Sequence, residues 1–388
     1  MKKSIRWDRR ELAGSLGDLG TFIPLLVGMV HTCRLDAATA LVFAGAFNIF
    51  TGLSFAIPMA VQPMKAIAAI AISEGLTPTQ IAAAGILTSV VVLILGVTNW
   101  ITHLDRWIPL SVVRGLQLAV GLSLLFKGIN LIADTGVFFA YDSIFTGLAG
   151  GILVLTLFFS RRYPGALVIF LIGIVLLLLE SPALLGSLRP DLAWPRWMPP
   201  SIDDFFQGAG RAAIAQIPLT LLNSGLAVCA LSRDLFPSNP ATTRKVSISV
   251  GIMNLLAGWF GAMPMCHGSG GLAGQYRFGA RTGGSVIFLG ICKVILGILF
   301  GGGLVLLLAA YPQSILGVLL IFSGMELSMV IREVTGRTSV FVMLLTAATS
   351  LALHSIALGF LIGWGLSLLF LRGILKLEKA NGDGKPPH

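Results

Sequence analysis

The chain has 388 residues, of which 55% are hydrophobic and only 11% are charged. Soluble domains carry roughly 25% charged residues, so this composition excludes a globular protein that faces water on all sides. The net charge of +10 would suit a nucleic-acid partner, but the positions of the basic residues explain it without one.

Apolar stretches long enough to cross a bilayer recur along the whole chain. A helix needs roughly 20 apolar residues to span ~30 Å of hydrocarbon. The sequence therefore predicts an all-α polytopic membrane protein with about 14 transmembrane segments. In chain order these lie at residues 11–30, 36–57, 62–74, 79–99, 109–130, 143–159, 164–180, 208–231, 244–262, 268–280, 284–307, 312–330, 338–353 and 355–373.

The distribution of Lys and Arg predicts the orientation of these segments. With both termini in the cytoplasm, about 20 of the 27 basic residues fall on the inner side or at inner helix ends. The basic residues that fall outside are Arg34, Arg189, Arg196 and Arg211. Membrane proteins concentrate Lys and Arg in cytoplasmic loops, so topology accounts for the charge. We expect an integral protein of the cell (inner) membrane that has no nucleic-acid partner.

Two segments far apart in the chain resemble each other. "NIFTGLSFAIPM" (Asn48–Met59) aligns without gaps on "NLLAGWFGAMPM" (Asn254–Met265), and five of the twelve positions are identical. Upstream, "FIPLL" (Phe22–Leu26) resembles "QIPLT" (Gln216–Thr220). The two similarities occur in the same order, each at the head of seven predicted segments. Because seven is odd, the second set must start on the opposite side of the membrane, which predicts a 7+7 inverted repeat of the kind found in transporters.

Both copies are interrupted at matching places. After Pro58 comes "VQPMKAIAAIAISEG", and after Pro264 comes "CHGSGGLAGQYRFG". Each holds about 11 to 13 helix-compatible residues, or ~18 Å of helix, which is roughly half a bilayer. We therefore predict half-helices in segments 3 and 10, each preceded by a short extended stretch. Paired interruptions of this kind indicate the substrate site of a transporter.

The residues around the two interruptions favour an anion. Helix N-termini offer unpaired N–H groups and partial positive charge, so two of them facing one pocket form an anion site. Pro63 suits the first helical position, where no N–H is needed, and Gly271 would let the backbone approach a ligand. The predicted binding shell consists of Thr21, Gln62, Lys65, Gly268, Ser269 and Gly270, followed by Gln216, Asn223, His267 and Gln275.

The charged residues near the site allow alternative interpretations. A charged side chain inside a membrane is costly unless it pairs with an opposite charge, faces water or binds a ligand. Lys65 therefore either attracts the anion, pairs with Asp18 or reaches an aqueous vestibule. His267 either contacts the ligand or packs as a structural residue. Arg277 and Arg281 are interpreted as anchors at the inner membrane surface, with contact to the substrate as the alternative. The predicted span 208–231 and the half-helix 268–280 contain no acidic residue, which argues against a cation as substrate.

Three segments resemble a known family. "GSLGDLGTFIP", "PMAVQPMKAIAAIAI" and "GAMPMCHGSGGLAGQYRFGARTG" are similar to the signature segments of the molybdate transporter family related to the SulP sulfate permeases. The resemblance implies the fold of sulfate permeases and uracil permease, with fourteen segments in two inverted sets and the substrate between segments 3 and 10. The chain lacks a C-terminal STAS domain and the acidic residues that nucleobase carriers use in segments 8 and 10.

The resemblance also implies a division into two domains. The core domain would comprise residues 1–99 and 208–308, and the gate domain would comprise residues 100–207 and 309–376. Residues 377–388 are expected to form a disordered tail. The scattered residues Cys33, Cys229, Cys266 and Cys292 form no Cys-x-x-Cys pair, so packing is predicted for them and neither a metal site nor a cofactor is expected.

The function implied is a secondary active transporter that imports molybdate by alternating access, and not an enzyme. Import of a dianion costs about 2.3 kcal/mol per charge per 100 mV, so coupling to protons is expected, with Asp18, Glu11 or His267 as carriers. Tungstate and sulfate fit the same donors, which leaves a sulfate or general oxyanion transporter as the close alternative. An oxyanion-selective channel is the alternative of another class, and a homodimer is open as the assembly state.

Overall fold

The computed structural model describes residues 5–101, 109–160, 165–187, 189–190 and 192–375. The first half contains α1 (Arg9–Ser15), α2 (Leu19–Cys33), α3 (Ala37–Phe55), β1 (Val61–Pro63), α4 (Lys65–Glu74), α5 (Pro78–Val97), α6 (Leu110–Ala133), α7 (Ile144–Ser160) and α8 (Gly165–Glu180). The second half contains α9 (Ile202–Gly208), α10 (Ile214–Thr220), α11 (Val228–Leu235), α12 (Thr243–Ala257), β2 (Met265–His267), α13 (Ser269–Arg277), α14 (Gly284–Ala309), α15 (Gln313–Ser328), α16 (Arg337–Ala352) and α17 (Ile356–Leu371).

Shorter helical turns connect or interrupt these helices. The 3₁₀ turns are η1 (Leu16–Asp18), η3 (Pro182–Ser187), η6 (Gly258–Phe260) and η7 (Met329–Glu333), and the π-helical turns are η4 (Ala209–Ala213) and η5 (Leu221–Ala227). Each predicted segment overlaps a helix or a run of helices. Within the described residues, seven helical runs are long and apolar enough to span a membrane, and the chain is an integral membrane protein. The predicted tail, 377–388, lies outside the described residues.

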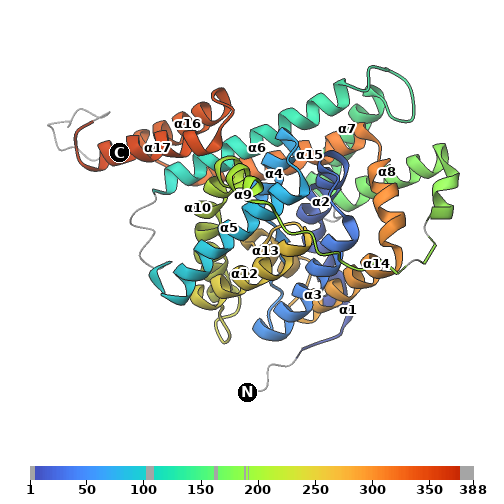
Figure 1. Ribbon diagram of the computed structural model, residues 1–388, viewed down its shortest axis with the longest axis horizontal. Helices are drawn as coiled ribbons and strands as arrows, with labels where there is room; N and C mark the ends of the chain where they lie inside the picture. Colours follow the sequence, from blue (N-terminus) through green and yellow to red (C-terminus); the bar gives the residue numbers. More distant parts are fainter. Residues whose placement is uncertain (1–4, 102–108, 161–164, 188, 191, 376–388) are drawn as a thin grey trace.

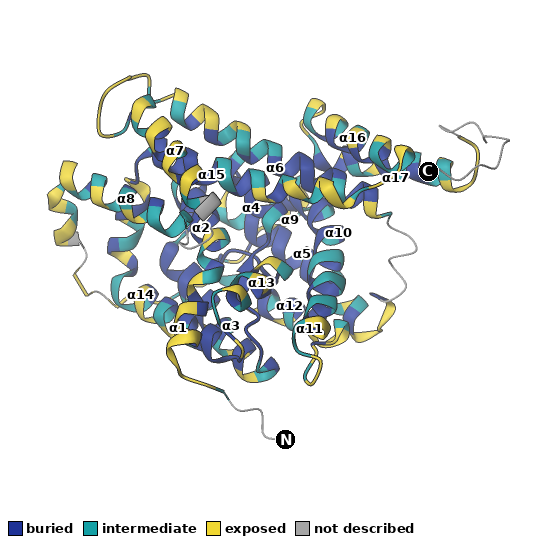
Figure 2. Ribbon diagram, turned by 180° about the vertical axis from the view of Figure 1, so that it is seen from behind, coloured by how far each residue is buried: buried dark blue, intermediate teal, exposed yellow. Residues whose placement is uncertain are grey.

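The helices form two layers that Figure 1 shows one above the other. α6, α7 and α15–α17 form the upper layer, and α3, α12, α13 and α14 lie in the lower body. In the lower body α3 packs along α14 and α5 along α12, whereas α6 packs along α15 and α16 in the upper layer. Figure 2 shows that the buried residues concentrate in the centre, around α2, α4 and α5. The half-helix α4 lies there, with Ala66–Ile72 buried throughout.

Glycines bring the paired helices into backbone contact. A Cβ added at Gly45 of α3 would lie 2.5 Å from the carbonyl oxygen of Gly290 in α14. A Cβ added at Gly128 of α6 would lie 2.5 Å from the carbonyl oxygen of Gly317 in α15. The hydrophobic effect does not drive helices together in lipid, so their association depends on van der Waals packing, which this close approach allows.

The two predicted interruptions meet at the centre of the molecule. β1 and β2 pair antiparallel, with Val61 opposite His267 and Pro63 opposite Met265. The predicted extended stretches and half-helices are therefore confirmed, but the expected start of the first half-helix is wrong. The helix begins at Lys65, and Pro63 belongs to the strand, because the residue before a proline avoids helical backbone and the pairing continues past it.

The first span breaks where glycines face the second half-helix. η1 interrupts the helix at Leu16–Asp18. A Cβ added at Gly17 would lie 2.7 Å from the backbone nitrogen of Gln275, and one at Gly14 would lie 2.6 Å from that of Ala280. The glycine-rich stretch "GSLGDLG" therefore packs tightly against the half-helix and the turn that follows it.

The eighth predicted segment, 208–231, begins earlier in the structure than the sequence predicts. It extends over Ile202–Leu235, so the predicted domain boundary between 207 and 208 falls within it. The start is fixed by a capping box in which the Ser201 hydroxyl accepts from the Asp204 N–H and the Asp204 carboxylate accepts from the Ser201 N–H. Such a box satisfies two N–H groups that a helix start leaves free.

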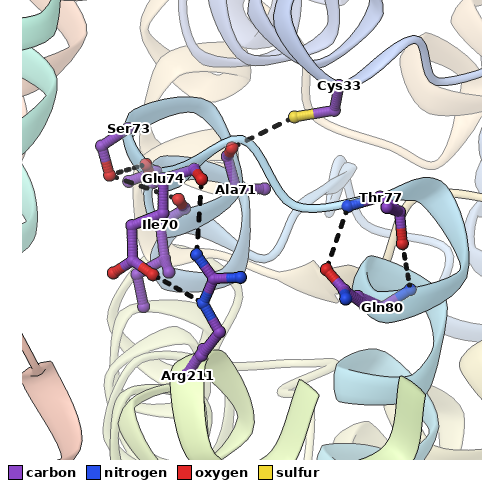
Figure 3. Close-up of polar contacts among 9 residues, drawn as sticks. Cys33, Ile70, Ala71, Ser73, Glu74, Thr77, Gln80 and Arg211 are labelled. Atoms are coloured by element: carbon purple, nitrogen blue, oxygen red, sulfur yellow. Dashed lines mark hydrogen bonds and ion pairs between the residues drawn. The ribbon is translucent and has the colours of Figure 1, made fainter. Parts of the chain in front are cut away.

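Side chains from two other elements hold the far end of α4 (Figure 3). Arg211 of η4 forms an ion pair with Glu74, at 2.8 Å between Nε and the carboxylate, and also donates to the Glu74 carbonyl. The Cys33 thiol of α2 donates to the carbonyl of Ala71 at 3.2 Å. α5 then begins with a capping box between Thr77 and Gln80. The half-helix is thus a fixed element, held at its C-terminal end.

Candidate functional site

A cavity of about 760 Å³ separates the half-helices from the upper layer. On one side it is lined by η1, α2, α4, η5 and α13, and on the other by α6, α15 and η7, with α7 and α8 at the edge. Five residues of the predicted shell line it, namely Thr21, Lys65, Asn223, Ser269 and Gly270.

The N-terminus of α13 opens into this cavity without a cap. The N-cap residue Gly268 provides no side chain, and no described residue accepts a hydrogen bond from the backbone N–H of Ser269 or Gly270. The Ser269 hydroxyl donates to Oδ1 of Asn223 at 2.9 Å, which leaves the Asn223 amide group as a donor beside the helix end. Helix N-termini of this kind bind anions.

Lys65 supplies a cation at the same place. Its side chain is partly exposed to the cavity, and it forms no hydrogen bond or ion pair with any described residue. A Cβ added at Gly270 would lie 3.9 Å from Lys65 Nζ, so the ammonium lies next to the open end of α13. Lys65 therefore forms no direct ion pair with Asp18, which was one alternative from the sequence, although the two charges attract each other. Its ammonium group lines the cavity, where a ligand can reach it.

Gln216 caps the first half-helix and does not line the cavity. Its Oε1 accepts from the backbone N–H groups of Ala66 at 2.9 Å and Ile67 at 3.2 Å, and its Nε2 donates to the Thr220 hydroxyl. Only 2% of Gln216 is exposed. The free N–H groups that were expected to face a ligand from this helix are thus already bonded, since a buried donor needs an acceptor.

Gln62 also lies behind the cavity wall. Its Nε2 donates to Oδ1 of Asp18 at 2.5 Å, and both residues are buried. Within the described part of the chain, Gln62 Oε1 and Asp18 Oδ2 have no hydrogen-bond partner. A Cβ added at Gly271 would lie 2.9 Å from the Gln62 amide, and Gly268 also contacts this side chain. These two glycines make room for Gln62, whereas Gly270 lines the cavity.

His267 and Gln275 are buried away from the cavity. His267 Nε2 lies 3.0 Å from the Ser249 hydroxyl, and its ring packs edge-on against Phe55 at 5.7 Å between centroids. Gln275 Oε1 accepts from the Ser285 hydroxyl at 2.6 Å. Neither side chain lines the cavity, so the packing interpretation of His267 agrees with the structure.

Glu11 holds a helix start in place. Its Oε1 accepts from the backbone N–H groups of Arg281 and Thr282, both at 2.9 Å, and its Oε2 accepts from Ser285 N–H at 3.1 Å. A carboxylate at a helix N-terminus is stabilised by the free N–H groups and the helix dipole. Glu11 therefore stabilises the beginning of α14, and it does not line the cavity.

Polar residues of the upper layer complete the cavity, and the sequence analysis missed them. They are Arg114 and Gln117 of α6, Ser323 and Glu326 of α15, and Glu333 of η7. Arg114 forms an ion pair with Glu333 and donates to Gln117 Oε1 at 2.6 Å. The signal in the sequence is a polar pair three residues apart in each of two apolar helices, since residues at this spacing share a helix face.

Arg277 differs from its expected role. It lines the cavity at the last turn of α13, whereas Arg281 stacks on the Tyr276 ring at 3.6 Å from the centroid. The two arginines were interpreted together as surface anchors, but α13 ends at Arg277 and the chain leaves the helix in a turn at Phe278 and Gly279, so the two side chains have different surroundings. The cavity thus carries the cations Lys65, Arg114 and Arg277.

The donor set suits an oxyanion and offers no metal ligands. Among the described residues no group of three His, Cys, Asp or Glu side chains comes together, and all four cysteines are free. Backbone N–H groups, an amide, hydroxyls and cations are the groups that bind anionic oxygens. The arrangement can therefore bind a small oxyanion at the open end of α13.

The fold resembles that of solved anion transporters. The structure of SLC26A9 has a TM-score of 0.69 at 15% sequence identity, covering 95% of this chain and 66% of that one. Murine Solute Carrier 26 family member A9 in its inward-facing state has a TM-score of 0.70 at 16% identity, covering 96% and 69%. The transmembrane domain of the cyanobacterial bicarbonate transporter BicA has a TM-score of 0.65 at 12% identity, covering 94% and 98%.

The sequence itself matches known molybdate transporters. Residues 10–124 and 208–327 match the family described as molybdate transporter of the MFS superfamily. Molybdate transporter 2 of Arabidopsis thaliana is 46% identical, covering 95% of this chain and 88% of the relative. Molybdate transporter 1 of Chlamydomonas reinhardtii is 34% identical, covering 91% and 89%. The chain therefore belongs to the molybdate transporter family.

Proposed function

We propose that this protein is a secondary active transporter that imports molybdate across the cell membrane by alternating access. The observation that carries the proposal is the juxtaposition of Lys65, which has no ionic partner among the described residues, with the uncapped N-terminus of α13 in one cavity. Both features attract negative charge, and a buried cation without a partner is costly unless a ligand uses it.

The chemistry of the shell matches a tetrahedral dianion. Molybdate has oxygens that accept hydrogen bonds and has no donor. The backbone N–H groups of Ser269 and Gly270, the amide of Asn223 and the hydroxyl of Thr21 can each donate to such an oxygen. Sulfate and tungstate present the same oxygens, so the choice of molybdate is supported by the relatives and not by the donor geometry.

The alternating-access mechanism is supported by the position of the cavity. Its walls come from both proposed domains, since Lys65 and Ser269 belong to the core and Arg114 and Glu326 to the gate. The antiparallel pairing of β1 with β2 agrees with an inverted repeat. Arg114, Arg277 and Glu333 lie toward the ends that the positive-inside rule assigns to the cytoplasm, so the proposed state is open inward.

Binding to the purified protein tests the site. Lys65→Ala should weaken molybdate binding at least about thirtyfold, because removing one partner of a buried charge pair costs roughly 2–5 kcal/mol. Gln62→Ala should have a smaller effect, since Gln62 lies behind the wall. Lys127→Ala is the matched control, because Lys127 is partly buried in α6 but does not line the cavity. Unchanged affinity in Lys65→Ala would show that the site is wrong.

Uptake measurements separate molybdate from other oxyanions. Cells that express the protein should accumulate labelled molybdate, and an excess of sulfate should compete weakly. Sulfate transport as fast as molybdate transport would establish the general oxyanion transporter instead. Current that rises with voltage and does not saturate with substrate would indicate a channel.

A further inference from the structure

One acidic residue lines the cavity without a partner. Glu326 projects from α15 into the cavity and is exposed there. It forms no hydrogen bond or ion pair with any described residue. The other cavity carboxylate, Glu333, forms an ion pair with Arg114. An unpaired carboxylate in a cavity built for a dianion has no structural explanation.

The elements packed against α15 provide few charges that face Glu326. These elements are α2, α6, α7, α8 and η7, and their Asp, Glu, His, Lys and Arg residues are His31, Arg114, Lys127, Glu180, Arg332 and Glu333. Of these, only Arg114 and Glu333 line the cavity, and they neutralise each other. The cavity wall also carries the cations Lys65 and Arg277. Lys65, which forms no ion pair with a described residue, is the cation available to the anion.

A charged Glu326 therefore opposes the binding of a dianion. A sphere of 760 Å³ is roughly 11 Å across, which is close to the Debye length of about 8 Å at physiological salt. The carboxylate and the anion repel each other anywhere in such a cavity, and both attract Lys65. A proton on Glu326 removes the repulsion and turns the carboxylate into an O–H donor for an anion oxygen.

We infer that Glu326 is the proton-coupling residue of the transporter, which binds one proton when molybdate binds and releases it when molybdate leaves. The inference rests on the proposed function. One proton from solvent forms the O–H bond of the Glu326 carboxyl group, and the same bond breaks when the cavity empties. The loaded carrier then moves a net charge of one, which halves the electrical cost of moving the dianion. Of the carriers expected from the sequence, Glu11 caps α14, His267 packs in the interior, and Asp18 lies behind the cavity wall, where it accepts from Gln62.

Binding measured against pH tests this role. Molybdate dissociation constants of the purified full-length protein are measured from about pH 5 to pH 8. If one proton binds with each anion, affinity rises by up to about tenfold per pH unit as pH falls. In Glu326→Gln the side chain is uncharged at every pH, so binding should be tight and independent of pH. Glu180→Gln is the matched control, because Glu180 is exposed on α8 and does not line the cavity.

Proton uptake provides a second readout. A pH indicator in weakly buffered solution should report about one proton taken up per molybdate by the wild type and none by Glu326→Gln. If Glu326→Gln does not fold, Glu326→Asp must retain both the pH dependence and the uptake. A pH dependence that persists in Glu326→Gln, or that is absent from the wild type, would overturn the inference. A wild type that binds no molybdate at any pH would overturn the proposed function as well.

Discussion

The two half-helices follow similar backbone paths but have different ends. The N-terminus of α4 is closed, because Gln216 Oε1 accepts from the N–H groups of its first turn. The N-terminus of α13 is open, because Gly268 cannot cap it and no other described side chain does. The residue aligned with Gln216 in the first half is Phe22, which has no acceptor to offer.

The difference extends to the side chains around the helix starts. The alignment of the two copies places Gln62 against Gly268 and Lys65 against Gly271. In the structure, these glycines leave the space that the Gln62 side chain occupies. One half-helix thus supplies side chains and the other supplies bare backbone, so the proposed anion site is single, where a symmetric pair would give two. The predictions below test this division.

The largest loss of molybdate affinity should come from a substitution that closes the uncapped N-terminus of α13. Gly270→Asp places a carboxylate at the N-terminus of α13, where only Lys65 Nζ lies within 4 Å of an added Cβ. Two unit charges about 4 Å apart interact by ~4 kcal/mol at an effective dielectric constant near 20. Molybdate affinity should therefore fall by at least about a hundredfold, while the carboxylate stabilises the helix by about 0.5 kcal/mol.

Gly270→Asn is the matched control for this change, because it adds the same bulk without the charge. It should weaken binding by no more than about fivefold. Isothermal titration of both variants measures the difference. Equal affinities of the Asp and Asn variants would place the anion away from α13.

The aligned asparagines should differ in their contribution to stability. Asn254 donates to the carbonyls of Val250 and Met265 and accepts from Met265 N–H, and it replaces the donor that the opposing Pro63 lacks. Asn48 accepts from Val61 N–H at 2.7 Å, and its Nδ2 has no partner among the described residues. At about 1 kcal/mol per hydrogen bond, Asn254→Ala should cost about 3 kcal/mol of unfolding free energy and Asn48→Ala about 1 kcal/mol.

Unfolding in a titration with denaturing detergent compares the two variants. The expected order is wild type, then Asn48→Ala, then Asn254→Ala. The opposite order would mean that β1, and not β2, depends more on its asparagine.

The comparison also separates what the sequence could predict from what it could not. Pro58 and Pro264, with the glycines and charges that follow, bound the half-helices, so their positions were predictable from helix length alone. The role of Gln216 was not, because a polar residue in a membrane helix can cap a backbone or bind a ligand with the same atoms. Only the position of α4 beside it decides between the two roles.

The cavity residues of the upper layer were missed for a related reason. The interruptions mark the polar residues next to them, whereas Glu326 and Arg114 lie in uninterrupted helices. Their spacing from Ser323 and Gln117 marks one face of each helix, but the partner of that face depends on how α6 and α15 pack. Close approach at Gly128 and Gly317 fixes that packing, and the contact joins residues far apart in the sequence.

Removing the Gln216 side chain that caps α4 should lower the free energy of unfolding by an amount between those expected for Asn48→Ala and Asn254→Ala. Gln216→Leu leaves the buried N–H groups of Ala66 and Ile67 without an acceptor, which should cost about 2 kcal/mol of unfolding free energy. The matched control is Gln275→Leu, which loses one hydrogen bond from a hydroxyl and removes an amide nitrogen that has no partner in the described residues.

Thermal unfolding in detergent should show a lower midpoint for Gln216→Leu than for Gln275→Leu. The affinity of folded Gln216→Leu for molybdate should stay within about fivefold of the wild type, because the side chain caps a helix and does not line the cavity. A loss of affinity with unchanged stability would instead make Gln216 a ligand.

The smallest loss of molybdate affinity should come from removing the Ser269 hydroxyl at the start of α13. The Ser269 hydroxyl donates a hydrogen bond to Asn223 Oδ1 at 2.9 Å, so we expect it to orient the amide toward the proposed anion site and to contribute little by itself. Ser269→Ala should therefore weaken binding about fivefold, or about 1 kcal/mol. If the hydroxyl acts through Asn223, the same substitution in an Asn223→Ala background should have no further effect, and the double-mutant cycle should give a coupling of about 1 kcal/mol. Additive losses would mean that Ser269 contacts the anion directly, since two independent ligands of one anion do not depend on each other's presence.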